Sequence, residues 1–95
     1  AKLLFHMQGR EGEIVRIDRF GNIITNLPPT GQEQYHAVLA DGSRRTLPFF
    51  PTYGVAPRGQ LFVTTGSAGT LEIALREDAA SRELPVRVGQ RVVLE

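Results

Sequence analysis

The chain has 95 residues, which is enough for one small domain with a single modest core. It carries 11 Lys and Arg against 10 Asp and Glu, and a net charge of +1 argues against a binder of the nucleic-acid backbone. The lack of Cys excludes disulfides, thiolate zinc sites and cysteine nucleophiles. No apolar run approaches the roughly 20 residues of a membrane helix, so we expect no membrane partner.

The N-terminal half begins with two predicted strands. Residues 1–11 are assigned to a linker or tail, and residues 12–95 to one domain. Residues 13–20 (EIVRIDRF) alternate, which places Val15 on one face with Ile17. A Gly-Asn turn then leads into a second strand over residues 23–27 (IITNL), which Pro-Pro ends.

A β-hairpin is the clearest local signal in the middle of the chain. Residues 35–40 and 43–49 flank Asp41-Gly42, a pair that accepts the positive φ of a type I′ turn. Residues 49–57 (FFPTYGVAP) contain two prolines and a glycine, so they are predicted to form an irregular aromatic loop.

The C-terminal third contains three further predicted strands, at residues 60–65, 70–75 and 90–94. Residues 77–84 (EDAASREL) alone look helical, because acidic residues lead and a proline follows. The sequence therefore predicts an all-β fold. We expect a single Greek-key β-barrel of about seven short strands with one short helix near the C-terminus.

Two possible signals of chemistry are better explained by structure. His6 and His36 are far apart in sequence and have no carboxylate at ligand spacing, so neither is predicted to bind metal. His36 is interpreted as an exposed strand residue. Residues 66–69 (GSAG) join two strands and lack a lysine, which favours a plain turn over a phosphate-binding loop.

The stretch at residues 18–26 (DRFGNIITN) allows two readings. Asp18 and Asn22 suit turn chemistry, because Asp accepts hydrogen bonds from nearby amides and Asn tolerates left-handed φ. The functional reading is that the Asn amide suits the edge of a purine and Asp18 an ammonium group. Phe20 and Tyr53 offer aromatic faces for a base, while Phe49 and Phe50 are more readily assigned to the core.

The segment VRIDRFGNIITN, at residues 15–26, closely resembles the start of one family's C-terminal domain. The family is the S-adenosyl-L-methionine (SAM) hydroxide adenosyltransferases, or SAM hydrolases, which are relatives of the SAM-dependent chlorinases and fluorinases. Three later segments resemble the family in the same order. They are LP with TYGV (47–48 and 52–55), GSAG with LEIA (66–69 and 71–74), and DAA with VGQ (78–80 and 88–90).

The resemblance implies a function as well as a fold. In that family a C-terminal β-barrel accompanies an N-terminal α/β domain, and the proteins form homotrimers. The active site lies between the domains of neighbouring subunits, where water or hydroxide displaces L-methionine from the 5′ carbon of SAM to give adenosine. The implied protein is a cytoplasmic enzyme with SAM as substrate, no other cofactor, no metal, and no nucleic-acid partner.

The resemblance also implies the role of individual residues. None is implied to be catalytic, because the α/β domain supplies the groups that position the nucleophile; this chain alone is therefore expected to be inactive. The residues implied to contact adenine are Asn22, Tyr53, Phe20, Ala74 and Arg76. Those implied to contact the methionine end are Asp18, Ser67 and Ala68.

Two positions depart from the family pattern. Gly66 stands where the turn usually has Asn, so a side-chain hydrogen bond is lost there. Ala68 stands where the halogenases have Arg, which favours hydrolysis over halogenation. The alternative to a SAM-binding domain is a stand-alone barrel of the OB type that binds nucleic acid or protein. Scattered arginines balanced by acids argue against it.

Overall fold

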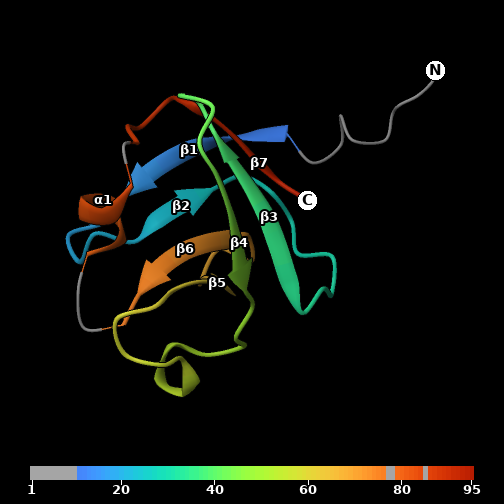
Figure 1. Cartoon of the computed structure of the whole chain (residues 1–95), viewed down its shortest axis with the longest axis vertical. Coiled ribbons are helices and arrows are strands. Elements are labelled where there is room, and N and C mark those ends of the chain that lie inside the picture. The colour runs from blue at the N-terminus through green and yellow to red at the C-terminus, as the bar shows by residue number, and fades with distance from the viewer. Residues whose placement is uncertain (1–10, 77–78, 85) are drawn as a thin grey trace.

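The computed structural model describes residues 11–76, 79–84 and 86–95, with the side chain of Tyr53 left aside. Within these ranges the chain forms seven strands, one 3-10 turn and one short helix (Figure 1). The strands are β1 (Glu11–Ile17), β2 (Ile23–Thr25), β3 (Gln34–Leu39), β4 (Arg44–Pro48), β5 (Leu61–Thr65), β6 (Leu71–Leu75) and β7 (Arg91–Leu94). The 3-10 turn is η2 (Tyr53–Val55) and the helix is α1 (Ala80–Glu83).

The strands form one antiparallel sheet in the order β4-β3-β7-β1-β2-β6-β5. The C-terminal strand β7 lies between β1 and β3, so the end of the chain joins the two halves of the sheet. The edge strands β4 and β5 come together at a parallel bridge between Phe49 and Val63, which makes the barrel nearly closed. The predicted all-β barrel with one short C-terminal helix is confirmed.

The core fills the inside of the barrel with branched aliphatic side chains and one aromatic ring. Thr25, fully buried, donates a hydrogen bond from Oγ1 to the carbonyl of Leu71 at 2.7 Å, which satisfies its hydroxyl. Tyr35 is also fully buried and packs against Phe49, with ring centroids 6.2 Å apart. The fully enclosed aliphatic residues of this core include Ile14, Ile23, Val63, Leu71, Ile73, Val92 and Leu94.

The first strand differs from its sequence pattern. The pairing of β1 with β2 shifts between Ile14 and Arg16, which is the signature of a β-bulge. The extra residue is Val15, whose side chain is 45% exposed, whereas Ile14 is fully buried. Ile17 packs against the core, so the prediction that Val15 shares a face with Ile17 is wrong: the extra residue of the bulge shifts the alternation.

The β3–β4 hairpin is confirmed, but its turn is not the expected type. The N–H of Gly42 donates to the carbonyl of Leu39, and the N–H of Leu39 donates to that of Ser43, both at 2.9 Å. The loop therefore has three residues, and Gly42, with φ 90°, occupies the left-handed position at its end. The carboxylate of Asp41 accepts from the Ser43 N–H at 2.9 Å and stabilises this longer loop.

The predicted helix at residues 77–84 is shorter in the structure. Helix α1 spans Ala80–Glu83, and residues 77, 78 and 85 lie outside the described part of the chain. Among the described helices, none is long and apolar enough to cross a membrane.

Candidate functional site

The turn between β1 and β2 is built around the carboxylate of Asp18. Its Oδ1 accepts hydrogen bonds from the backbone N–H groups of Phe20 at 2.9 Å and Asn22 at 3.0 Å. The backbone N–H of Asp18 in turn donates to the carbonyl of Asn22 at 3.1 Å. Turn chemistry predicted from the sequence is thus present, because Asp18 satisfies amides two and four residues ahead.

The side chain of Asn22 also points at Asp18. Its Nδ2 donates to Asp18 Oδ2 at 3.2 Å. A carboxylate only accepts, so this contact fixes which end of the Asn22 amide carries nitrogen. The opposite end, Oδ1, is buried and accepts no hydrogen bond from any residue that the structure describes. A buried acceptor without a donor is costly, so this atom is suited to a ligand that brings an N–H group.

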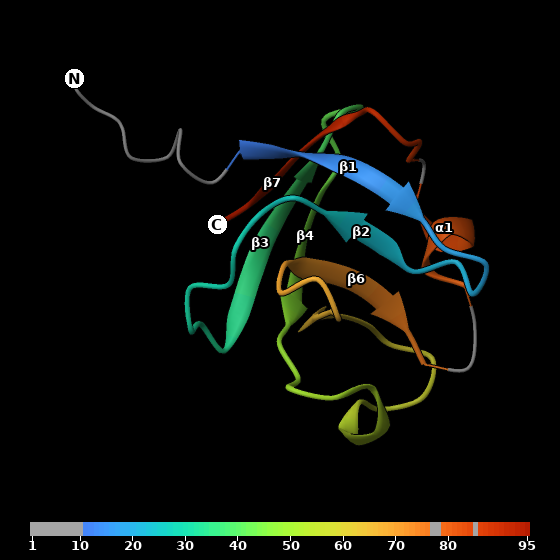
Figure 2. The ribbon, with the colours of Figure 1, turned by 180° about the vertical axis from the view of Figure 1, so that it is seen from behind.

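Helix α1 supports the turn from behind (Figure 2). Gly21 is buried with φ 84°, and an added Cβ would collide with the side chain and backbone of Ala79. The carbonyl of Gly21 accepts a hydrogen bond from the N–H of Ser81 at 3.0 Å. Only glycine combines this φ with so close an approach, so the position of the turn depends on residue 21.

The strands next to the turn present one row of residues whose side chains face away from the barrel core. The registers place Arg16 of β1 opposite Ile24 of β2, Ile24 opposite Glu72 of β6, and Glu72 opposite Thr64 of β5. Burial, and to a lesser extent the negative charge of Asp18, raise the pKa of Glu72, while the charge of Arg16 opposes them. Glu72 is therefore electrostatically part of the same region as Asp18.

A second layer covers the β5–β6 part of this face. Phe62 and Ala74 pair across the two strands and pack with Ala56 and Phe50 in a small separate cluster. The rings of Phe50 and Phe62 meet edge to face at 5.9 Å. Because Ala74 is only 1% exposed beneath this layer, its side chain is not available to a ligand. Contact with Ala74 is thus limited to its backbone.

Arg76 fastens the loop that carries η2. Its Nη1 donates to the carbonyl of Ala56 at 2.9 Å, which ties the loop to the end of β6. The guanidinium thereby holds the backbone of η2 (Tyr53–Val55), while the Tyr53 side chain lies outside the described structure. The structure therefore gives Arg76 a role in holding this loop.

Phe20 lies on the surface beside Asp18. Its side chain is 65% exposed, and the guanidinium of Arg19 stands 5.2 Å from the ring centroid. An open pocket of about 470 Å³ lies along this segment. It is lined by Arg16, Ile17, Asp18, Arg19 and Phe20. The structure thus places Phe20 and Asp18 on one depression of the surface.

Residues 66–69 form the tight turn that the sequence predicts. The N–H of Gly69 donates to the carbonyl of Gly66, and the N–H of Gly66 donates to that of Thr70, both at 3.0 Å. Ser67 and Ala68 are exposed at its tip. An added Cβ at Gly66 would overlap the carboxyl group of Glu72, so this turn lies directly against Glu72.

The predicted residues therefore fall into three groups. Asp18, Asn22 and Phe20 are together in one turn, Ser67 and Ala68 lie in another, and Ala74 and Arg76 lie at the end of β6. The two turns are linked through Glu72, which the sequence analysis missed. The signal available in the sequence was a single charged residue within the apolar strand at residues 70–75.

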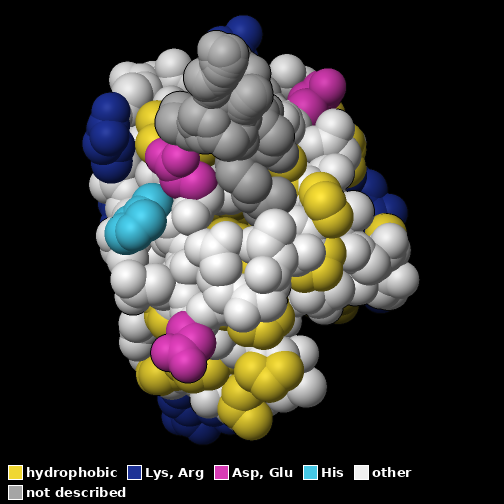
Figure 3. All heavy atoms as spheres, turned by 90° about the vertical axis from the view of Figure 1, so that its right-hand side faces the viewer, with side chains coloured by type: hydrophobic (Ala, Val, Ile, Leu, Met, Phe, Trp, Pro, Cys, Tyr) yellow, Lys and Arg dark blue, Asp and Glu magenta, His cyan; other side chains and the backbone are white. Residues whose placement is uncertain are grey.

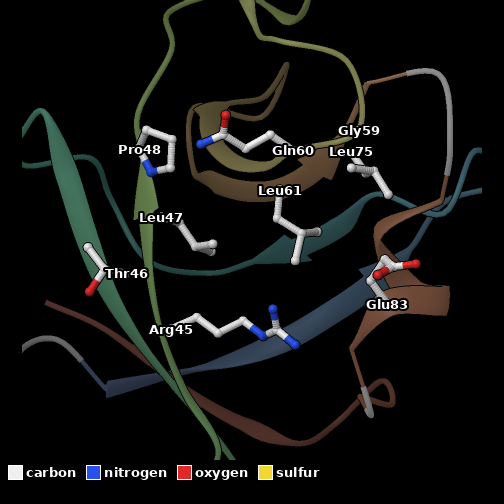
Figure 4. Close-up of a pocket in the computed structure, with 9 residues that line it drawn as sticks. All are labelled: Arg45, Thr46, Leu47, Pro48, Gly59, Gln60, Leu61, Leu75 and Glu83. Atoms are coloured by element: carbon white, nitrogen blue, oxygen red, sulfur yellow. The ribbon is translucent and has the colours of Figure 1, made fainter.

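A further pocket of about 460 Å³ lies at the seam between the two edge strands. Leu47 of β4 and Leu61 of β5 point into this gap, with Arg45 on one side and Glu83 of α1 on the other (Figure 4). None of the predicted site residues lines it. The candidate site and the seam pocket are separate features of the barrel.

The charge pattern (Figure 3) and the exposure of His36 agree with the predictions from the sequence, while His6 lies outside the described residues. The face in Figure 3 carries separate basic and acidic side chains rather than a continuous basic band. His36 is exposed, and its Nδ1 lies 3.0 Å from Thr46 Oγ1, which agrees with a structural role. No group of His, Asp or Glu with metal-binding geometry occurs among the described residues.

The fold and the turn define the chain as a small antiparallel barrel with a polar, ligand-sized region on one outer face. Residues 12–93 match the family described as the SAM hydroxide adenosyltransferase C-terminal domain. The chain belongs to this family, as the resemblance of residues 15–26 implied.

Known proteins similar to the chain agree with this assignment. It is 38% identical over 89 residues to a protein of Thermus thermophilus named (R)-S-adenosyl-L-methionine hydrolase, covering 92% of the chain and 32% of that protein. Among solved structures, a conserved protein of Thermotoga maritima matches with a TM-score of 0.80 at 27% identity, over 90% of the chain and 35% of the other. A conserved hypothetical protein of Thermus thermophilus matches with a TM-score of 0.76 at 33% identity, over 100% of the chain and 39% of that protein. The chain thus spans about a third of the length of these relatives.

Proposed function

We propose that this chain is the substrate-binding domain of a SAM hydrolase, and that it holds the adenine and methionine parts of SAM. The family assignment and the name of the Thermus thermophilus relative support this function. In the proposed reaction, water or hydroxide attacks the 5′ carbon of SAM, the bond from that carbon to sulfur breaks, and L-methionine leaves with the electron pair. Adenosine is the other product.

The observation that carries the proposal is the buried Oδ1 of Asn22. The exocyclic amino group of adenine is an N–H donor, and a donor at this position would satisfy the buried acceptor that the described residues leave without a partner. Asp18 Oδ2 accepts one hydrogen bond within the turn and retains acceptor capacity for the methionine ammonium. Both groups are held in place before ligand arrives, which lowers the entropic cost of binding.

Catalysis is assigned to the whole protein and not to this chain. The reaction depends on holding the nucleophile in line with the sulfonium leaving group. The proposed partners are an N-terminal α/β domain of the same protein and that of a neighbouring subunit in a homotrimer. We expect this chain alone to bind SAM or adenosine weakly and to leave SAM unhydrolysed.

The test is a titration of the 95-residue chain with SAM, with adenosine and with a single-stranded oligonucleotide, followed by backbone amide shifts. Shifts centred on Asp18, Asn22 and Ser67 support the proposal. Salt-sensitive binding of the oligonucleotide spread over the arginines, without any response to SAM, would establish the OB-type alternative instead.

A matched pair of variants in the full-length protein tests the adenine contact. Asn22→Ala is expected to lower kcat/KM for SAM at least about tenfold, since one buried hydrogen bond to the ligand is lost. Asn26→Ala is the control, because Asn26 is exposed and its Oδ1 accepts from the backbone of Glu13 at 2.9 Å. Equal turnover by the Asn22→Ala and Asn26→Ala proteins would contradict the adenine assignment.

A further inference from the structure

Glu72 lies in the row of residues that face away from the barrel core, between Ile24 and Thr64. Its cross-strand neighbours are Ile24 on β2 and Thr64 on β5, which are 7% and 8% exposed. The acidic side chain is itself half-buried between these two nearly enclosed residues. A carboxyl group at such a position is partly removed from water and needs a compensating interaction.

The carboxyl group of Glu72 lies over the backbone of Gly66. An added Cβ on residue 66 would overlap Oε2 and also approach Cγ at 3.0 Å. Glycine at 66 therefore leaves the space that the Glu72 side chain occupies. The side chain thus reaches the turn that carries Ser67, at the other end of the face from Asn22.

No described residue compensates the charge of Glu72 by direct contact. Its carboxylate forms no hydrogen bond or ion pair within the described part of the chain. The charged groups that act on it are Asp18, which disfavours its ionisation, and Arg16, which favours it. Its neighbours from β2 and β5, Ile24 and Thr64, have no titratable group.

We propose that Glu72 is a specificity-determining residue of the candidate site, whose negative charge selects SAM, a cation, over neutral adenosine. This inference rests on the proposed function and adds to it a residue that acts through charge. A positively charged ligand beside Asp18 offsets the repulsion that Asp18 exerts on Glu72, so that the partly desolvated carboxylate gains a favourable partner. Neutral adenosine supplies no such partner.

The independent sign that this face receives a ligand is the buried Oδ1 of Asn22. Asn22 lies in the same turn as Asp18, and the negative charge of Asp18 raises the pKa of Glu72. The pocket beside Asp18 is lined by Arg16 as well, so both charged groups that influence Glu72 border the same depression. A ligand in it would lie within the electrostatic reach of all three side chains.

The experiment measures KM for SAM and the product-inhibition constant of adenosine with the full-length protein at pH 7.5, because the active protein would consume SAM during an equilibrium titration. Glu72→Gln keeps the shape and removes the charge; it is expected to weaken SAM binding about tenfold and to leave adenosine binding within twofold. Glu72→Asp, which retains the charge, is expected to recover most of the preference for SAM. Glu83→Gln is the control, because Glu83 is exposed on α1 and lines the separate seam pocket.

The possible results separate this inference from the proposed function. If Glu72→Gln weakens SAM and adenosine equally, or neither, the selectivity role is overturned while the proposed function stands. If the unmodified protein binds neither ligand, the proposed function fails and the inference fails with it. The inference is supported if the preference for SAM over adenosine falls in Glu72→Gln but not in Glu72→Asp or Glu83→Gln. A purely structural role of Glu72 would lower both affinities together.

Discussion

The amide of Asn22 and the carboxylate of Asp18 are in direct contact, with Nδ2 3.2 Å from Oδ2. This contact has two effects on the turn. It turns the nitrogen of the amide toward Asp18 and leaves Oδ1 as a buried, unused acceptor within the described structure. It also joins the two residues predicted to hold opposite ends of one ligand, so a change at Asp18 affects the orientation of Asn22.

Substitution of Asp18 by Asn is expected to destabilise the turn. The carboxylate accepts from two backbone N–H groups through Oδ1 and from Asn22 Nδ2 through Oδ2. In Asp18→Asn, an NH₂ group would replace Oδ2 and face the NH₂ group of Asn22, and two donors cannot bond to each other. We expect Asp18→Asn to lower the free energy of unfolding by about 1–3 kcal/mol, measured by urea denaturation. The control Asp41→Asn makes the same chemical change in the exposed β3–β4 turn and is expected to cost less. Equal losses in both variants would contradict a special role for Asp18.

Gly21 is expected to tolerate substitution worse than other glycines with positive φ. Gly21→Ala combines a left-handed backbone with a collision against Ala79, whereas Gly31→Ala, at φ 75°, meets nothing within 4 Å. Gly31→Ala should lower the free energy of unfolding by about 1 kcal/mol, the cost of the backbone conformation, and Gly21→Ala by at least twice as much. Thermal unfolding of both proteins measures the difference. Similar losses would show that the packing of the turn on α1 contributes little.

The pH dependence of stability should contain a contribution from Glu72. Its pKa is raised above the ordinary value of 4.5, chiefly by burial and then by Asp18. The folded state therefore favours the protonated carboxyl, and this stabilisation is present below pH 4.5 and is lost as pH rises through the raised pKa.

The expected result is that Glu72→Gln becomes more stable relative to the unmodified chain as pH rises from 4 to 7. The change should stay below about 1 kcal/mol, because the group is partly exposed and screened by solvent. Urea denaturation of both proteins at the two pH values measures it. A stability difference that does not vary with pH would rule out a raised pKa at Glu72.

The loop that carries η2 should depend on Arg76. Arg76→Met keeps the apolar stem of the side chain but removes the hydrogen bond to the carbonyl of Ala56. We expect amide hydrogen exchange at residues 53–56 to become about fivefold faster, since a hydrogen bond of about 1 kcal/mol is lost. Arg44→Met, on the exposed part of β4, is the control. Unchanged exchange in Arg76→Met would show that the Phe50–Phe62 packing alone holds the loop.

Local interactions explain why much of the turn could be predicted from the sequence. Asp18 bonds to amides only two and four residues away, so its spacing from Asn22 is visible in the chain itself. The β3–β4 hairpin is likewise a local feature, although the position of Gly42 makes its loop one residue longer than expected. The strands were predictable because their apolar positions alternate.

Features that depend on distant segments were not predictable in this way. The bulge that exposes Val15 follows from how β1 pairs with its neighbours on both sides. The covering of Ala74 depends on the loop at residues 49–58, which folds back over β5 and β6. Alternation within one strand says which side chains share a face, but it does not say what lies above them.

The strands and the Asp18 turn were predictable because each depends on residues close together in the chain, and the number of short strands indicated the barrel class. Three features depend on tertiary packing: Glu72 lies against Gly66, Asn22 Oδ1 is buried without a donor among the described residues, and Arg76 holds the η2 loop. The registers of β2, β6 and β5 bring these groups together across up to 50 positions of sequence. Such registers are selected by the packing of the whole core, and no short segment encodes them.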